Sequence, residues 1–151
     1  MTYDLTMTRL IPATPEEVFD AYTDPEKQRI WFSILSEEPG YVKIEADLRV
    51  GGEMTNVWGP NENEVFYENN LIRVFEPPHR LAVTSSGGSP DGMTMTTEID
   101  ITFEPADGGT LVTVVQTGFP TADMRDFFST VAWVGALDRI ETYLERVHSA
   151  G

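Results

Sequence analysis

The stretch TADMRDFFSTVAWVGALDRIETYLERV, residues 121–147, contains no proline and a single glycine, Gly135. Within it, apolar residues recur at steps of four and three, at Trp133, Leu137, Ile140, Leu144 and Val147. This spacing predicts one long helix with one buried stripe. Residues 40–118 read as strands and turns, so the helix must cover a single curved sheet. Such an arrangement tends to enclose a cavity.

The composition indicates one globular domain spanning residues 1–151. Hydrophobic residues make up 40% of the chain and aromatic residues 11%, as in folded proteins. The absence of cysteine excludes disulfides, thiolate catalysis and cysteine metal sites. No apolar run approaches the roughly 20 residues that span a bilayer, and the N-terminus lacks a signal region. We therefore expect a cytoplasmic protein that does not insert into membranes.

The chain is strongly acidic, with 25 Asp and Glu against 10 Lys and Arg and a formal net charge of -15. A surface of this sign repels the phosphates of nucleic acids and the faces of anionic membranes. We therefore expect no nucleic-acid partner. The plainest interpretation is that the charge maintains solubility, while a salt-rich cytoplasm and a basic protein partner remain alternatives.

The first third of the chain predicts a strand followed by two short helices. Residues 2–11 favour a strand, which ends at Pro12. Thr14 can cap a helix that has Pro15 at its first position and Glu17 at the spacing of a capping box. A second short helix begins near Pro25 and extends to Phe32.

The middle of the chain predicts an antiparallel meander, because strand-like segments follow one another through short turns. Asn69 and Asn70 predict a bulge, since Asn tolerates left-handed backbone angles. The glycine-rich residues 87–92 predict a flexible loop. The expected strands cover residues 41–47, 54–58, 65–75, 81–85, 95–103 and 111–117.

Five segments in chain order carry a resemblance to a known family. They are residues 23–32 (TDPEKQRIWF), 47–52 (DLRVGG), 76–84 (EPPHRLAVT), 108–113 (GGTLVT) and 133–144 (WVGALDRIETYL). Together they resemble the START-like (SRPBCC) superfamily, and within it the branch named for homology to the activator of the heat-shock-protein-90 ATPase. The resemblance implies an α+β helix-grip fold. In this fold a curved antiparallel sheet of six to seven strands wraps around the long C-terminal helix, with two short helices after the first strand.

The sequence offers no catalytic signature. His79 and His148 lack the spacing of metal ligands and read as surface residues. No serine stands in a nucleophile elbow, and residues 87–92 lack the Lys and Ser/Thr of a phosphate loop. The family motifs themselves identify the fold and not a chemistry. We expect no catalytic residue, no metal site and no cofactor, and a role other than catalysis is favoured.

A pocket between sheet and helix is the remaining candidate site, by alternation along the strands and by the resemblance. A buried amide needs hydrogen-bond partners, so the inward amides are expected to meet a ligand or ordered water. The resemblance places His, in many members, where this chain has Gln116. The predicted lining residues are Trp31, Phe32, Met54, Asn56, Trp58, Phe66, Ile99, Ile101, Val114, Gln116, Met124, Phe128, Val131 and Trp133.

Three functions remain open at this point. The first is binding of a small apolar or amphipathic molecule, with the N-terminal half of the long helix, from Met124 to Val131, as the gate. The second, implied by the resemblance, is a co-chaperone-like module with a chaperone as its partner. The third is a cyclase or hydrolase that uses the cavity. Both a monomer and a homodimer are compatible with the chain.

Overall fold

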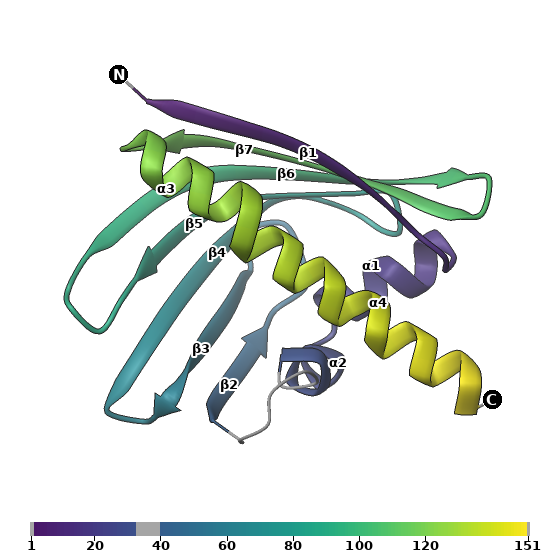
Figure 1. The fold of residues 1–151 in the computed structure, drawn as a ribbon, viewed down its shortest axis with the longest axis horizontal. Coiled ribbons are helices and arrows are strands. Elements are labelled where there is room, and N and C mark those ends of the chain that lie inside the picture. The colour runs from purple at the N-terminus through teal and green to yellow at the C-terminus, as the bar shows by residue number, and fades with distance from the viewer. Residues whose placement is uncertain (1, 33–39, 151) are drawn as a thin grey trace.

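The computed structural model describes residues 2–32 and 40–150, and Figure 1 shows their fold. Seven strands form one antiparallel sheet in the order β1-β7-β6-β5-β4-β3-β2. Each strand from β2 to β6 pairs with the next strand in the chain, and β1 pairs with β7. The strands are β1 (Tyr3–Ile11), β2 (Tyr41–Ala46), β3 (Glu53–Asn61), β4 (Glu64–Glu76), β5 (Arg80–Gly88), β6 (Thr94–Ala106) and β7 (Gly109–Phe119).

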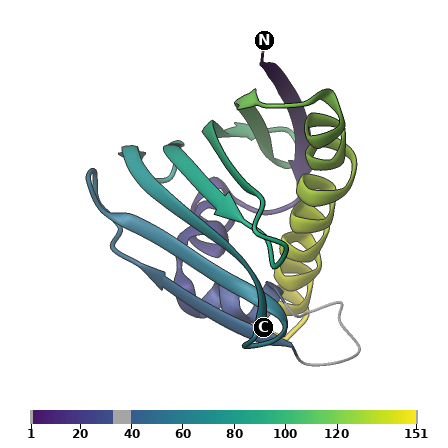
Figure 2. The same cartoon turned by 90° about the vertical axis from the view of Figure 1, so that its left-hand side faces the viewer.

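The helices lie on the concave side of this sheet (Figure 2). Two short helices follow β1, and a long helical stretch follows β7, which confirms the predicted α+β helix-grip fold with its meander. Within the described ranges, no helix combines the length and the apolar character needed to cross a membrane. The helical elements are α1 (Pro15–Thr23), α2 (Pro25–Phe32), α3 (Ala122–Phe127), the π-helix η1 (Phe128–Ala132) and α4 (Trp133–Ala150).

The C-terminal helix packs on the sheet through the predicted stripe. Trp133, Leu137, Ile140 and Leu144 are all buried in the core. The prediction is wrong for Val147, the last residue of the stripe, which is 44% exposed near the end of the helix. The stretch differs from the prediction in one turn, because η1 interrupts the α-helix. The hydroxyl groups of Ser129 and Thr130 donate hydrogen bonds to the backbone carbonyl of Asp126. Such bonds compete with the regular backbone ladder of an α-helix and favour an irregular turn.

Two local predictions in the sheet are wrong. Asn69 and Asn70 pair regularly with both β3 and β5, and the register shift between β4 and β5 lies instead between Ile72 and Val74. No non-glycine residue in the described part of the chain has a positive φ, so neither Asn is left-handed. β5 also continues through Gly87 and Gly88, which belong to the sheet and not to a flexible loop.

The start of α1 has the predicted capping box. The backbone N–H of Glu17 donates to Thr14 Oγ1 at 3.2 Å, and the backbone N–H of Thr14 donates to Glu17 Oε1 at 3.0 Å. The second carboxylate oxygen of Glu17 lies 2.5 Å from Nε2 of His148 on α4. This contact with His148, followed by the bonds from Thr14, lowers the pKa of the Glu17 carboxyl. One side chain thus joins the beginning of α1 to the end of α4.

We expect Thr14→Ala to lower the free energy of unfolding by about 1 kcal/mol, because the N-cap acceptor is lost. Thr14→Ser keeps the acceptor and serves as the control. Urea unfolding of both variants measures the difference. Equal stability of Thr14→Ala and the parent would contradict a stabilising role for this cap.

Candidate functional site

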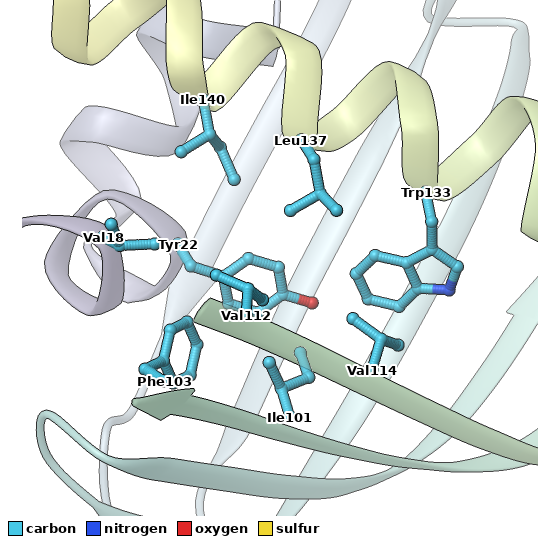
Figure 3. Close-up of a pocket in the computed structure, with 9 residues that line it drawn as sticks. All are labelled: Val18, Tyr22, Ile101, Phe103, Val112, Val114, Trp133, Leu137 and Ile140. Carbon is cyan, nitrogen blue, oxygen red and sulfur yellow. The ribbon is translucent and has the colours of Figure 1, made fainter. Parts of the chain in front are cut away.

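A small cavity lies between α4 and the sheet (Figure 3). Its volume, taken as the space open to the centre of a water molecule, is about 10 Å³. That is room for about one water molecule at most. A binding site for a larger molecule would therefore have to lie elsewhere on the concave face. The cavity is lined by Val18, Tyr22, Ile101, Phe103, Val112, Val114, Trp133, Leu137 and Ile140, three of which (Ile101, Val114 and Trp133) belong to the predicted pocket.

A chain of hydrogen bonds bounds this cavity and fixes α4 to the sheet. Trp133 Nε1 donates to Gln116 Oε1 at 2.8 Å, and Gln116 Nε2 donates to Thr97 Oγ1 at 2.8 Å. Tyr22 of α1 stacks on Trp133 with a centroid distance of 6.3 Å. Gln116 is only 1% exposed, yet both ends of its amide have protein partners. The expectation that a ligand or water satisfies Gln116 is therefore wrong.

Beyond Gln116 the concave face becomes polar. Strand pairing places Asn56 opposite Glu68, and Asn70 opposite Ser85, which in turn faces Thr97. Directly opposed side chains have Cβ atoms about 4.5–5.5 Å apart, and residues two apart on one strand lie about 7 Å apart. These five side chains, which we call the polar band, therefore form one compact patch across β3, β4, β5 and β6.

Two amide oxygens of the polar band have no hydrogen-bond partner among the described residues. They are Asn56 Oδ1 and Asn70 Oδ1, both shielded from solvent. Asn70 is 6% exposed, and its Nδ2 donates to the backbone carbonyl of Met54 at 3.3 Å, which sets the orientation of the amide. Leaving a buried acceptor unpaired costs about 1–3 kcal/mol. The polar band therefore contains acceptors that lack donors.

Glu68 places a carboxyl group in the same patch. The residue is half-buried, and burial raises the pKa of its carboxyl, while hydrogen bonding from Asn70 and Ser85 opposes the rise. Burial raises the pKa of the Tyr22 hydroxyl, and the nearby charge of Glu68 raises it further. None of the ion pairs formed among the described residues includes Glu68. Its charge is thus without a cationic side chain as partner.

The sheet position beside Glu68 carries no side chain. Gly87 of β5 is the direct neighbour of Glu68 in the sheet. A Cβ atom built on Gly87 would come within 4 Å of one group alone, the backbone carbonyl oxygen of Tyr67, at 3.3 Å. No side-chain atom therefore lies within 4 Å of that Cβ position, which we call the open space over Gly87.

Aromatic side chains border the polar band on one side. Trp31 stacks on Phe32 at 4.7 Å between ring centroids, Phe32 lies 5.8 Å from Trp58, and Trp58 stacks on Phe66 at 5.8 Å. Trp58 and Phe66 are cross-strand partners, two residues from Asn56 and Glu68. Phe66 is 42% exposed. We call these four residues the aromatic rim, and all four belong to the predicted pocket.

The other predicted residues lie away from this patch or below it. Met54 and Ile99 are buried in the core, and Met124 and Phe128 pack against it in part. Val131 is 55% exposed. Because α3 contacts β1 and β7, and η1 contacts β1, the N-terminal half of the helical stretch lies near the opposite edge of the sheet from β3.

Sequence reasoning missed the residues that make this patch unusual. Alternation from Phe66 would have put Glu68 and Asn70 on the inward face. The bulge wrongly assigned to Asn69 and Asn70 interrupted that alternation. The missed residues are Tyr22, Glu68, Asn70, Ser85, Gly87 and Thr97.

The remaining features of the described chain are weaker candidates. A depression of about 380 Å³ lies open on the surface near the Glu17–His148 contact, between the first turn of α1 and the β6–β7 hairpin. Among the described residues, no three Asp, Glu or His side chains are grouped to hold a metal ion.

Comparison with known proteins identifies the family. Residues 12–145 match the family described as activator of Hsp90 ATPase homolog 1-like protein. The chain belongs to this family. The match confirms the resemblance drawn from the five segments. No curated protein matches the chain.

Solved structures share the fold of this family member. An uncharacterized protein from Rhizobium leguminosarum is 21% identical, with a TM-score of 0.80 over 97% of this chain and 96% of its own. A protein from Rhodobacter sphaeroides is 24% identical, with a TM-score of 0.73 over 97% and 93%. Protein CV1439 from Chromobacterium violaceum is 23% identical, with a TM-score of 0.75 over 92% and 95%. At these identities the likeness establishes the fold alone.

We expect Gln116→Leu to lower the free energy of unfolding by about 1–3 kcal/mol, because it leaves the buried indole N–H of Trp133 without an acceptor. Thr113→Val, on the outer face of the same strand, is the matched control. Thermal unfolding of both variants provides the measurement. If Gln116→Leu is as stable as the control, the bond does not hold the helix.

We expect Glu68→Gln to stabilise the protein at pH 8 and not at pH 4. The native state retains the Glu68 proton to higher pH than the unfolded chain does, so stability falls as pH rises through the raised pKa. Removing the charge abolishes this loss, with a gain of roughly 2–4 °C in Tm per kcal/mol. Melting curves across this range measure the effect. A Tm difference that does not depend on pH would contradict the assignment.

Proposed function

We propose that this protein binds a small amphipathic molecule on the concave face of its sheet, over Gly87 and between the aromatic rim and the polar band. The observation that carries the proposal is the open space over Gly87 beside unpaired polar atoms. A packed core would fill such space or supply the missing donors. In this protein, a bound small molecule can fill the space and supply the missing hydrogen-bond donors.

The surroundings of this space have the composition of a ligand site. Small-molecule sites are mostly apolar, with a few polar groups that orient the ligand. Trp58 and Phe66 supply an apolar surface that is partly open to solvent, and Asn56 and Glu68 supply polar groups one pleat away. Both kinds of surface lie on one continuous face, which favours a ligand with an apolar part and a polar part.

The proposal is tested with N-phenyl-1-naphthylamine, a neutral hydrophobic dye whose fluorescence increases on binding. We expect the parent protein to bind the dye and Gly87→Val to bind it at least about tenfold more weakly, because the valine side chain occupies the open space. Valine suits a strand, and its Cβ requires the Tyr67 carbonyl oxygen to shift by only a few tenths of an ångström, so we expect the fold to persist.

Ser86→Val is the matched control, since it adds the same side chain to the next residue on the opposite face of β5. It should bind the dye like the parent. Absence of binding to the parent, or equal loss of binding in both variants with their folds intact, would overturn the proposal. Circular dichroism of each variant verifies the fold.

A further inference from the structure

The polar band differs from an ordinary polar lining in its balance of donors and acceptors. Asn56 Oδ1 and Asn70 Oδ1 are both acceptors without donors among the described residues. The carboxyl group of Glu68 lies between them in the pattern of the sheet, opposite Asn56 and two residues from Asn70. An ionised carboxylate is acceptor-only, so it adds to the surplus. With Glu68 ionised, the patch therefore has more acceptors than donors.

The charge of Glu68 favours a positively charged hydrogen-bond donor over a neutral one. An ionised carboxylate that is taken out of water without a partner is strongly disfavoured, and it either takes up a proton or binds a cation. No ion pair among the described residues includes Glu68, and residues 33–39 contain no Lys, Arg or His that could supply one. A cation from solution can fill this role.

We propose that the ligand is an organic cation, a primary amine in its ammonium form that lies against Glu68, Asn56 and Asn70 with its apolar part over Trp58 and Phe66. This inference rests on the proposed function and names the ligand class of the same site. An ammonium group carries three N–H donors and no acceptor, which matches the surplus of acceptors. The aromatic faces one pleat away also attract cations.

Two further observations agree with this class of ligand. The formal net charge of -15 raises the local concentration of cations around the protein. The side chains that face Glu68 from the elements packed around it are Tyr22 of α1, Asn56 of β3 and Ser85 of β5, and all three are uncharged at neutral pH. Nothing in this group competes with an ammonium ion for the carboxylate.

The experiment compares three probes with the same eight-carbon chain, octylammonium, 1-octanol and octanoate, by calorimetric titration at pH 8. We expect octylammonium to bind about tenfold more tightly than 1-octanol, because a hydrogen bond between charged groups is the stronger kind. Octanoate should bind more weakly than both, because its carboxylate has the same charge as Glu68. Glu68→Gln should remove the preference, so that octylammonium binds this variant no more tightly than 1-octanol does.

Glu53→Gln on β3 is the matched control, because it removes the same charge from an exposed side chain on the outer face of the neighbouring strand. It should keep the preference of the parent. A second readout needs no variant. Below the raised pKa of Glu68, binding of octylammonium should release a proton, which titrations in buffers of different ionisation enthalpy detect, whereas 1-octanol should release none.

The outcomes separate the two proposals. Equal affinity of the parent for octylammonium and 1-octanol, or a preference that survives in Glu68→Gln, overturns the cation assignment and leaves the amphipathic site in place. Failure of all three probes to bind overturns both. If Glu68→Gln does not fold, proton release by the parent decides, and its absence with octylammonium overturns the assignment.

Discussion

The hydrogen bond from Trp133 to Gln116 is the interaction on which the arrangement of this protein depends. It joins the helix to the middle of the sheet, and Gln116 in turn donates a hydrogen bond to Thr97 on the neighbouring strand. The indole ring also supports Tyr22 of α1. One aromatic side chain therefore positions the long helix, a short helix and two strands. On one side of it the core is apolar and closed, and on the other side the concave face is polar and partly open.

This division explains how a small domain can hold buried polar groups without losing its core. The apolar half supplies the burial that stabilises the fold, with Leu137, Ile140 and Leu144 packed on the sheet. The polar half contributes less to stability, because Asn56 and Asn70 each leave an acceptor unpaired. Groups that weaken the free protein in this way are common where a ligand completes the structure.

Much of the fold could be predicted from local pattern. The spacing of Trp133, Leu137 and Ile140, and the capping box at Thr14, are set by neighbours in the chain, and both were confirmed. The site was harder to predict. The bond between Trp133 and Gln116 joins two elements whose relative position is tertiary information, and no spacing encodes it. The role of Glu68 could be reached by alternation, but a bulge assigned from the tolerance of Asn for left-handed angles concealed it. The preference of Asn for left-handed backbone angles did not decide the structure there, because Asn69 and Asn70 pair with strands on both sides.

The π-helix turn has a consequence for how the helical stretch faces the sheet. The backbone N–H of Trp133 bonds to the carbonyl of Phe128, five residues earlier. In a regular α-helix, residues five apart point about 140° away from each other. The wider turn instead brings Phe128, which packs against Phe119 at 5.3 Å, onto the same side as Trp133. The single extra residue therefore rotates the side chains of one helical segment about the helix axis relative to those of the other. Each segment can keep its own contact with the curved sheet, one near β1 and β7 and the other over the centre, although a straight helix with one stripe could follow only one of these directions.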